Sequence, residues 1–278
     1  METRDYRVPA NGLELHVTEW GPADGRPVLM LHGIRGYAQT FHGLAQALPD
    51  RRVIAYDQRG RGLSDWDPAR EYYTASYVAD LDAVATQLGL GRFDLLGHSM
   101  GGIAAIVYAA THPGKVDRMV IEDAGPDAFE HSSGAGRIRA ELTNAPLSFE
   151  SFDHARAFMR ALRPSVTEEA REERLRNMLQ VHPDGSCSWR YDHAGIAQAR
   201  LDPLPGHSVD LWPHVKALAC PTLVLRGGRS DYLSADTALR MADANPHIRW
   251  SEVPDAGHYV HDDQPELVAQ AVRAFLAG

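Results

Sequence analysis

The stretch FDLLGHSMGGIAAIVYAA, residues 93–110, decides the fold. Its first four residues are typical of a buried strand, and residues 103–110 are rich in alanine and branched apolar side chains, as in a helix that packs on a sheet. Between them lies the pattern Gly97-x-Ser99-x-Gly101. A tight turn from strand to helix leaves no room for side chains beside the serine and lifts its hydroxyl clear of the sheet. The stretch therefore predicts a strand–turn–helix unit that exposes Ser99 as a nucleophile.

Short apolar runs alternate with helical patterns along the rest of the first half. Residues 28–31, 52–56 and 119–121 are typical of strands, and residues 77–88 have the apolar spacing of an amphipathic helix. This alternation indicates βαβ units around a mostly parallel sheet. An early strand over residues 13–20 is expected to be antiparallel. The pattern resumes near the end, with strands predicted at 221–225 and 248–253 and helices at 235–242 and 265–276.

The segment between these two parts has a different character. From residue 126 to residue 213, helical segments rich in arginine and glutamate replace the apolar runs, notably at 155–162 and 168–179, and no strand pattern is visible. An insertion of about 90 residues in an α/β chain is long enough to form a lid. We therefore expect a core of residues 1–125 and 214–278 and a helical cap of residues 126–213.

The composition argues against several classes of function. With 278 residues, 44% of them hydrophobic, and a net charge of −9, the chain is typical of a globular enzyme rather than a partner of nucleic acid or an anionic membrane. Two cysteines are too few for a disulfide framework and lack metal-ligand spacing. Neither a signal peptide nor a run of roughly 18 apolar residues is visible. We expect a cytoplasmic protein with a small-molecule substrate, no cofactor and no metal, and a homo-oligomer stays open.

A serine hydroxyl becomes a good nucleophile only when a base takes its proton. His258 lies in a loop directly after the last predicted strand. This loop is at the carboxyl edge of the sheet, where Ser99 is also expected. His261 is the nearest competitor in the sequence. We assign His258 as the base.

The base in turn needs a carboxylate that fixes its tautomer. Two candidates follow strands at the same edge: Asp231, just past the strand at 221–225, and Asp123, at the end of the strand before the insertion. Both satisfy the chain order of serine, acid and histidine. We prefer Asp231 and keep Asp123 as the alternative acid.

The negative oxygen of a tetrahedral intermediate needs backbone donors. One is expected to be the N–H of Met100, the residue after the nucleophile. The other is expected to be the N–H of Ile34, in the loop that follows the His-Gly pair at 32–33. Arg35 and Tyr37 of this loop are candidates to project into the site. There Arg35 would hold a substrate carboxylate, unless it is a solvated surface residue.

These motifs resemble those of the α/β-hydrolase fold superfamily, in its capped branch. The resemblance rests on short motifs spread over nearly the whole chain: His32-Gly33, Asp57-Gln58-Arg59-Gly60-Arg61-Gly62-x-Ser64, Gly97-His98-Ser99-Met100-Gly101-Gly102, Gly228-x-x-Asp231 and Gly257-His258. It implies a mostly parallel eight-stranded sheet flanked by helices, with a helical cap inserted before the seventh strand. It also implies that the turn at 57–64 is structural and that Asp231 stands at the usual place for the acid.

Several activities occur in this superfamily. Haloalkane dehalogenases and epoxide hydrolases use aspartate as the nucleophile, and Ser99 argues against both. C–C hydrolases of meta-cleavage products usually have asparagine and tryptophan where this sequence has His98 and Tyr259. The ending around His258 is also similar to that of enzymes that hydrolyse (E)-2-(acetamidomethylene)succinate. Their acid follows the strand before the cap, at the place of Asp123.

The sequence thus predicts a serine hydrolase that cleaves a small carboxylic ester or lactone through an acyl-enzyme. A C–C bond or amide hydrolase with the same triad is the alternative, and a non-catalytic small-molecule receptor is a further one. The cap is expected to supply the substrate pocket, with Trp189 and Arg190 as candidate contacts beside Tyr259 of the core. The competing interpretation is that the aromatic residues of the cap form the cap's own core.

Overall fold

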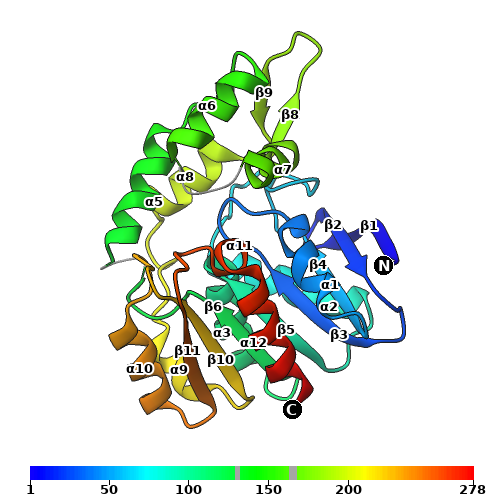
Figure 1. The fold of residues 1–278 in the computed structure, drawn as a ribbon, viewed down its shortest axis with the longest axis vertical. Coiled ribbons are helices and arrows are strands. Elements are labelled where there is room, and N and C mark those ends of the chain that lie inside the picture. The colour runs from blue at the N-terminus through cyan, green and yellow to red at the C-terminus, as the bar shows by residue number, and fades with distance from the viewer. Residues whose placement is uncertain (129–131, 163–167) are drawn as a thin grey trace.

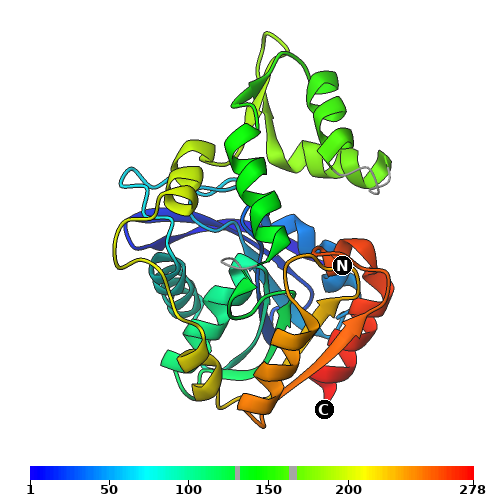
Figure 2. The ribbon, with the colours of Figure 1, turned by 90° about the vertical axis from the view of Figure 1, so that its left-hand side faces the viewer.

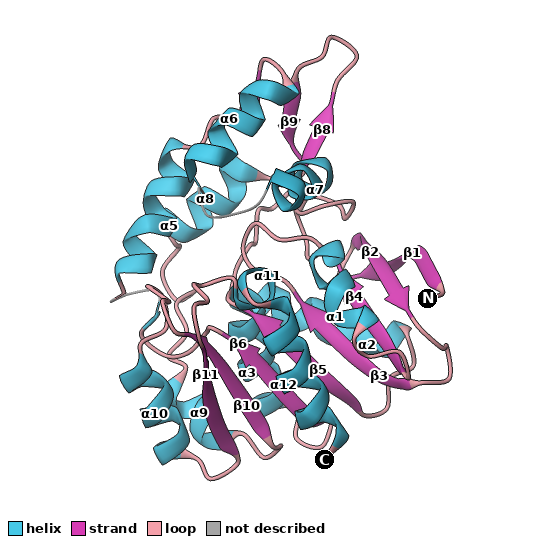
Figure 3. Ribbon diagram, viewed as in Figure 1, coloured by secondary structure: helices cyan, strands magenta, loops and turns pink. Residues whose placement is uncertain are grey.

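A computed structural model of the chain describes residues 1–128, 132–162 and 168–278. Its core is an eight-stranded sheet with the strand order β1-β2-β4-β3-β5-β6-β10-β11 (Figure 1, Figure 3). The strands are β1 (Thr3–Ala10), β2 (Leu13–Trp20), β3 (Arg26–Leu31), β4 (Arg51–Tyr56), β5 (Phe93–His98), β6 (Val116–Glu122), β10 (Thr222–Gly227) and β11 (Ile248–Val253). β2 pairs antiparallel with β1 and β4, and the other neighbours pair parallel. The predicted fold class is confirmed.

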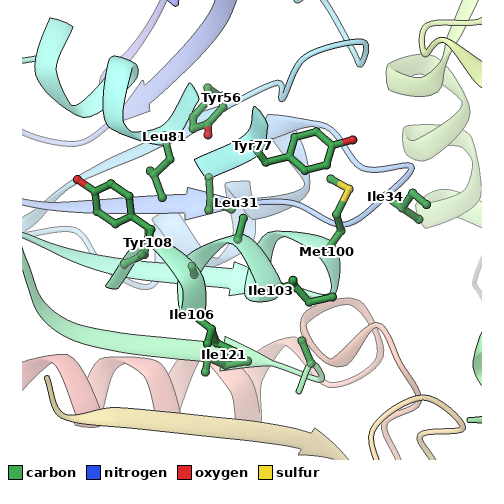
Figure 4. Close-up of a cluster of buried hydrophobic side chains, with 14 of the residues drawn as sticks. Leu31, Ile34, Tyr56, Tyr77, Leu81, Met100, Ile103, Ile106, Tyr108 and Ile121 are labelled. Carbon is green, nitrogen blue, oxygen red and sulfur yellow. The ribbon is translucent and has the colours of Figure 1, made fainter. Parts of the chain in front are cut away.

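Helices cover both faces of the sheet, which is why its central strands are apolar throughout. One face is covered by α2 (Thr74–Gln87), α3 (Met100–Thr111), α9 (Trp212–Ala217) and α10 (Ala235–Ala244), and the other by η1 (Ala38–Phe41), α1 (His42–Gln46) and α12 (Pro265–Ala277). Successive side chains of β5 alternate between the two layers, so that Leu95 enters the first and Leu96 the second. Figure 4 shows the first layer, where Leu81 and Ile106 lie around Leu31. No helix in the described ranges is long and apolar enough to cross a membrane.

The predicted strands and helices of the core are confirmed with small shifts at their ends. The helix after Ser99 begins at Met100 rather than at residue 103, because two glycines in its first turn hide the helical pattern. Strand β1 was not predicted from its residues. It is an edge strand that pairs with β2 alone, and its first residues are exposed or half-buried, so polar side chains dominate it.

The insertion between β6 and β10 stands over the carboxyl ends of the parallel strands (Figure 1, Figure 2). It contains α5 (Ser133–Asn144), α6 (Phe152–Leu162), α7 (Glu168–Met178) and α8 (His193–Leu201), with a small antiparallel sheet of β7 (Ser148–Phe149), β9 (Cys187–Trp189) and β8 (Leu179–Val181). The insertion is mainly helical, as predicted, but its three short strands were not predicted, because strands of two or three residues are too short to show an alternating pattern. The boundaries at 126 and 213 stay a prediction.

The insertion has an aromatic core of its own. The ring of Trp189 lies 5.0 Å from that of Phe149 and 5.2 Å from that of Tyr191, measured between centroids, and Phe158 packs on the same cluster. All but Phe158 are less than 5% exposed. This cluster holds the small sheet against the helices of the insertion.

Candidate active site

Ser99 lies at the sharp turn between β5 and α3. Its backbone has φ +54° and ψ −119°, a strained conformation for a residue with a side chain. The turn is possible because its glycines allow close approach. A Cβ on Gly97 would lie 2.4 Å from the carbonyl oxygen of Gly101, and a Cβ on Gly101 would lie 2.3 Å from that of Leu31. The geometry of the predicted nucleophile turn is therefore present.

A row of three side chains runs inward from this turn. The Ser99 Oγ lies 2.9 Å from Nε2 of His258, and Nδ1 of the same imidazole lies 2.8 Å from Oδ2 of Asp123. All three residues are buried, with the Ser99 and His258 residues only 4% and 6% exposed. With the Nδ1 proton donated to Asp123, Nε2 is left as the acceptor for the serine hydroxyl.

Asp123 is held in place by groups of the neighbouring loop. It follows the last residue of β6 with φ +48°. Its Oδ1 accepts the N–H of Gly227 at 3.0 Å, and Oδ2 accepts the hydroxyl of Ser230 at 2.6 Å. These hydrogen bonds orient the carboxylate toward His258.

Asp231, the preferred acid in the sequence analysis, does not contact His258. Its carboxylate accepts two hydrogen bonds from Arg137 of α5, at 2.7 and 2.9 Å. The hydrogen bond from Arg137 lowers the pKa of Asp231 and outweighs the effect of partial burial. The preference for Asp231 is thus corrected in favour of the alternative, Asp123. The loop after β10 turns so that Ser230 faces Asp123, while the next side chain points to the insertion.

The two predicted oxyanion donors lie on either side of Ser99. Met100 is the first residue of α3, and the first N–H groups of a helix have no acceptor within the helix. Ile34 lines the same cavity as Ser99. The preceding Gly33 packs so closely that a Cβ there would lie 3.4 Å from Cβ of Ser99. The structure therefore brings both residues to the serine, and their role as donors stays a prediction.

Arg35, Tyr37 and Tyr259 line the cavity as predicted. Arg35 is not a solvated surface residue, since its side chain is only 9% exposed. It forms an ion pair with Glu141 of α5 and hydrogen bonds with Tyr259 and Tyr191. Burial by itself would lower the pKa of Arg35, but the nearby Tyr259 and Glu141 raise it above its ordinary value.

Trp189 and Arg190 are not among the described residues that line this cavity. Trp189 belongs to the aromatic core of the insertion, and its indole N–H donates to the carbonyl of Pro146 at 2.7 Å. Arg190 donates through Nε to the carbonyl of Leu179 at 2.8 Å. The structure thus favours the competing interpretation, in which the cap aromatics pack against each other.

Further residues line the cavity that were not predicted to bind substrate, among them Thr40, His98, Ile138 and Arg174. His98 belongs to the serine motif, and its Nε2–H donates a hydrogen bond to the carbonyl oxygen of His258 at 2.9 Å. Burial lowers its pKa well below the ordinary value, so the ring is neutral. Ile138 and Arg174 come from the insertion, where no sequence pattern pointed to them.

His261, the competitor of His258, also lines the cavity but is turned away from the serine. Its Nδ1 lies 2.5 Å from Oε2 of Glu122, and its Nε2 lies 3.2 Å from the hydroxyl of Thr40. This second histidine–carboxylate contact joins the same two segments as the contact between His258 and Asp123. It therefore fixes the loop that presents His258.

The comparisons with known proteins agree with this architecture. The sequence model of the family described as the alpha/beta hydrolase fold matches residues 26–265. The chain belongs to the α/β-hydrolase family. Among its relatives, the sn-1-specific diacylglycerol lipase of Mus musculus is 33% identical over 264 residues, which cover 92% of this α/β hydrolase and 83% of the relative. The 3-hydroxybutyrate-oligomer hydrolase of Cupriavidus necator is 29% identical over 279 residues, with coverage of 96% and 94%.

A solved structure is similar over the whole chain. The crystal structure of E-2-(acetamidomethylene)succinate hydrolase matches this α/β hydrolase with a TM-score of 0.87 and 29% sequence identity, and it covers 100% of both chains. The resemblance to these hydrolases that the sequence indicated is confirmed. This α/β hydrolase is an enzyme, and the activities named for these relatives are hydrolytic.

Proposed function

We propose that this α/β hydrolase is a serine hydrolase that cleaves a small carboxylic ester or lactone through an acyl-enzyme. The observation that supports the proposal is the hydrogen-bonded row of Ser99, His258 and Asp123, with contacts of 2.9 and 2.8 Å. The nearly complete burial of this row suits a small substrate, because a large one would not reach the serine.

The mechanism follows from the donors and acceptors of this row. His258 takes the proton of Ser99 as the hydroxyl attacks the ester carbonyl, and Asp123 stabilises the imidazolium that forms. The negative oxygen of the tetrahedral intermediate accepts hydrogen bonds from the N–H groups of Ile34 and Met100. His258 then gives the proton to the leaving alkoxide. In the second half His258 takes a proton from water, which attacks the acyl-enzyme, and it returns the proton to the Ser99 oxygen as the bond to the acyl group breaks and the acid leaves.

The names of the relatives support an ester more than another bond. One relative that is 33% identical is named a diacylglycerol lipase, and lipases cleave carboxylic esters. Arg35, Tyr37 and Tyr259 are the proposed substrate contacts in the core, because they line the cavity that contains Ser99.

The proposal is tested by hydrolysis of p-nitrophenyl acetate, butyrate and octanoate by the wild type and by Ser99→Ala. We expect turnover by the wild type and its loss in the variant, since the variant lacks the hydroxyl that lies 2.9 Å from Nε2 of His258. The dependence on chain length then measures the depth of the acyl pocket. A folded wild type without turnover of any of the three esters would contradict the proposal.

An amide or C–C bond hydrolase is the second candidate. It is favoured by the structural match over the whole chain to an (acetamidomethylene)succinate hydrolase, since the same row of residues serves either reaction. Turnover of (acetamidomethylene)succinate with a higher kcat/KM than the p-nitrophenyl esters would favour this candidate. A preference for the esters would reject it.

A further inference from the structure

The turn at residues 57–64 lies directly beneath the loop that contains Ile34. The N–H of Gln58 donates to Nε2 of His32 at 3.0 Å, and its side-chain amide donates to the carbonyl of His32 at 2.6 Å. Asp57 accepts the N–H of Ala38, at the other end of the same loop, at 2.7 Å. The turn therefore supports both ends of the loop.

Arg61 of this turn contacts both residues proposed as oxyanion donors. Its Nε donates to the carbonyl of Ile34 at 3.1 Å, and its Nη2 donates to the sulfur of Met100 at 3.4 Å. The third group, Nη1, donates to the carbonyl of Arg59 at 2.7 Å. Figure 4 shows Ile34 and Met100 on neighbouring segments, with Tyr77 beside them. A single side chain thus connects the two segments that flank Ser99.

The guanidinium of Arg61 is buried. The residue is 0% exposed, and its guanidinium stacks on the rings of Tyr72 and Tyr77 at 5.4 and 5.0 Å. Within the described ranges no carboxylate lies at ion-pair distance from it, whereas the neighbouring Arg59 pairs with Asp80 at 2.6 Å and with a second aspartate. Burying an unpaired charge is costly, so a role that uses the charge is expected.

The place of this charge suggests its role. A tetrahedral intermediate on Ser99 would develop its negative charge between Ile34 and Met100, and Arg61 contacts both. In a site of low dielectric constant, a fixed positive charge beside these two residues favours the negative charge in the transition state more than it favours the neutral ester. The contact with the Ile34 carbonyl also restricts the rotation of the adjoining peptide groups.

We infer that Arg61 is a positioning residue of the oxyanion site. It holds the Ile34 and Met100 segments in place, and its buried charge favours the intermediate formed on Ser99. The inference rests on the proposed function, since it assumes that Ser99 forms a tetrahedral intermediate. It assigns a role in the reaction to a turn that family resemblance treats as structural only.

The experiment compares Arg61→Met and Arg61→Lys with the wild type. The readouts are kcat and KM for p-nitrophenyl butyrate and the inhibition constant of n-butylboronic acid, which forms a tetrahedral anion on a serine hydroxyl. For Arg61→Met we expect kcat to fall by roughly 30- to 100-fold, somewhat less than the loss of a direct oxyanion donor, with KM changed by less than about threefold. The affinity of Arg61→Met for the boronate is expected to fall by a similar factor. Arg61→Lys is expected to lie between the wild type and Arg61→Met in both kcat and boronate affinity.

Arg51→Met is the matched control. Arg51 is also a largely buried arginine, but it is the first residue of β4 and so lies at the amino ends of the parallel strands, away from Ser99. There it pairs with Asp94 at 2.8 Å. Arg51→Met is expected to lower the free energy of unfolding without changing the boronate affinity. If Arg61→Met does not fold, the comparison of Arg61→Lys with the wild type decides whether the inference holds. Lysine keeps the positive charge but lacks the separate N–H donors of the guanidinium.

The outcomes separate the inference from the proposed function. A folded Arg61→Met with unchanged kcat and boronate affinity overturns the inference and leaves the proposed function standing. A fall in kcat without a fall in boronate affinity also overturns it, because a purely structural role would act that way. A wild type that binds the boronate but cleaves no ester rejects the proposed substrate class, and the boronate series still tests Arg61. A wild type that does neither overturns both.

Discussion

The loops that follow β6 and β10 each place an aspartate at the carboxyl edge of the sheet, yet only one of them contacts His258. Asp123 has a fully buried side chain and is held by core groups from the other loop. The side chain of Asp231 is 36% exposed and pairs with Arg137 of the insertion. The difference shows that position at the edge of a sheet does not determine the direction of a side chain, which depends on local backbone and on available partners.

The second loop serves the insertion rather than the serine. The N–H of Gly134 donates to the carbonyl of Asp231 at 2.7 Å, and a Cβ on this glycine would lie 2.7 Å from the Asp231 carboxylate. One end of α5 is thus anchored to the loop after β10. Further along the same helix, Glu141 pairs with Arg35 beside the serine. Helix α5 therefore crosses the cavity between two contacts with the core.

The largest effect is expected at the loop after β6, which contains Asp123. Asp123→Asn should lower kcat for p-nitrophenyl butyrate by about 10⁴-fold, because the amide no longer holds the His258 tautomer or stabilises the imidazolium. Asp231→Asn, measured in the same assay, is the matched control. A loss of this size in the control, with Asp123→Asn near the wild type, would reverse the assignment of the acid.

An intermediate effect is expected when the pH is lowered. Protonation of His32 should destabilise the core before acid breaks the pair of Asp231 with Arg137, which anchors α5. Burial lowers the pKa of His32 from 6.5 to about 4, against the opposing effect of Asp57. The stability that neutral His32 contributes is complete above its unfolded pKa of 6.5 and is lost as the pH falls toward about 4. The full loss is on the order of 3 kcal/mol. The Asp231 pair persists to lower pH, since the pKa of Asp231 is lowered.

Urea unfolding of the wild type and of His32→Gln, at about pH 7.5 and about pH 5, measures this loss. Over that interval the free energy of unfolding of the variant should fall by about 2 kcal/mol less than that of the wild type. Buried His98, whose pKa is also lowered, adds to the acid sensitivity of both proteins in the same direction. Equal pH dependence in the two proteins would contradict a neutral, buried His32.

The smallest effect is expected at the anchor of α5. Asp231→Asn and Arg137→Met should each lower the free energy of unfolding by about 0.2 to 1 kcal/mol, because the pair is more than a third exposed. The effect should shrink as salt is raised. The double variant should lose no more than Arg137→Met alone, since both changes remove the contact with Asp231 and Arg137 also pairs with Glu141. Additive losses would show that the two residues act separately.

Much of this molecule follows from local pattern. The strand–turn–helix around Ser99 was predictable because the chemistry of the turn requires glycines at fixed spacing. His258 was predictable because it follows a strand that ends at the same edge. Two features of the insertion were not predictable: the short strands β7 to β9, and the positions of Ile138 and Arg174 in the lining of the cavity. Neither a two-residue strand nor an isolated cavity residue forms a repeating pattern.

The sequence by itself determined the fold class and indicated that Ser99, His258, Ile34 and Met100 lie at one edge of the sheet, because each depends on neighbours within a few positions or on the end of a strand. The tertiary structure alone decided which aspartate faces His258 and that Arg61 spans Ile34 and Met100. It also showed that Trp189 packs inside the insertion. These outcomes depend on side-chain directions and contacts between segments far apart in the chain, which folding sets through packing and hydrogen bonding and which no local spacing encodes.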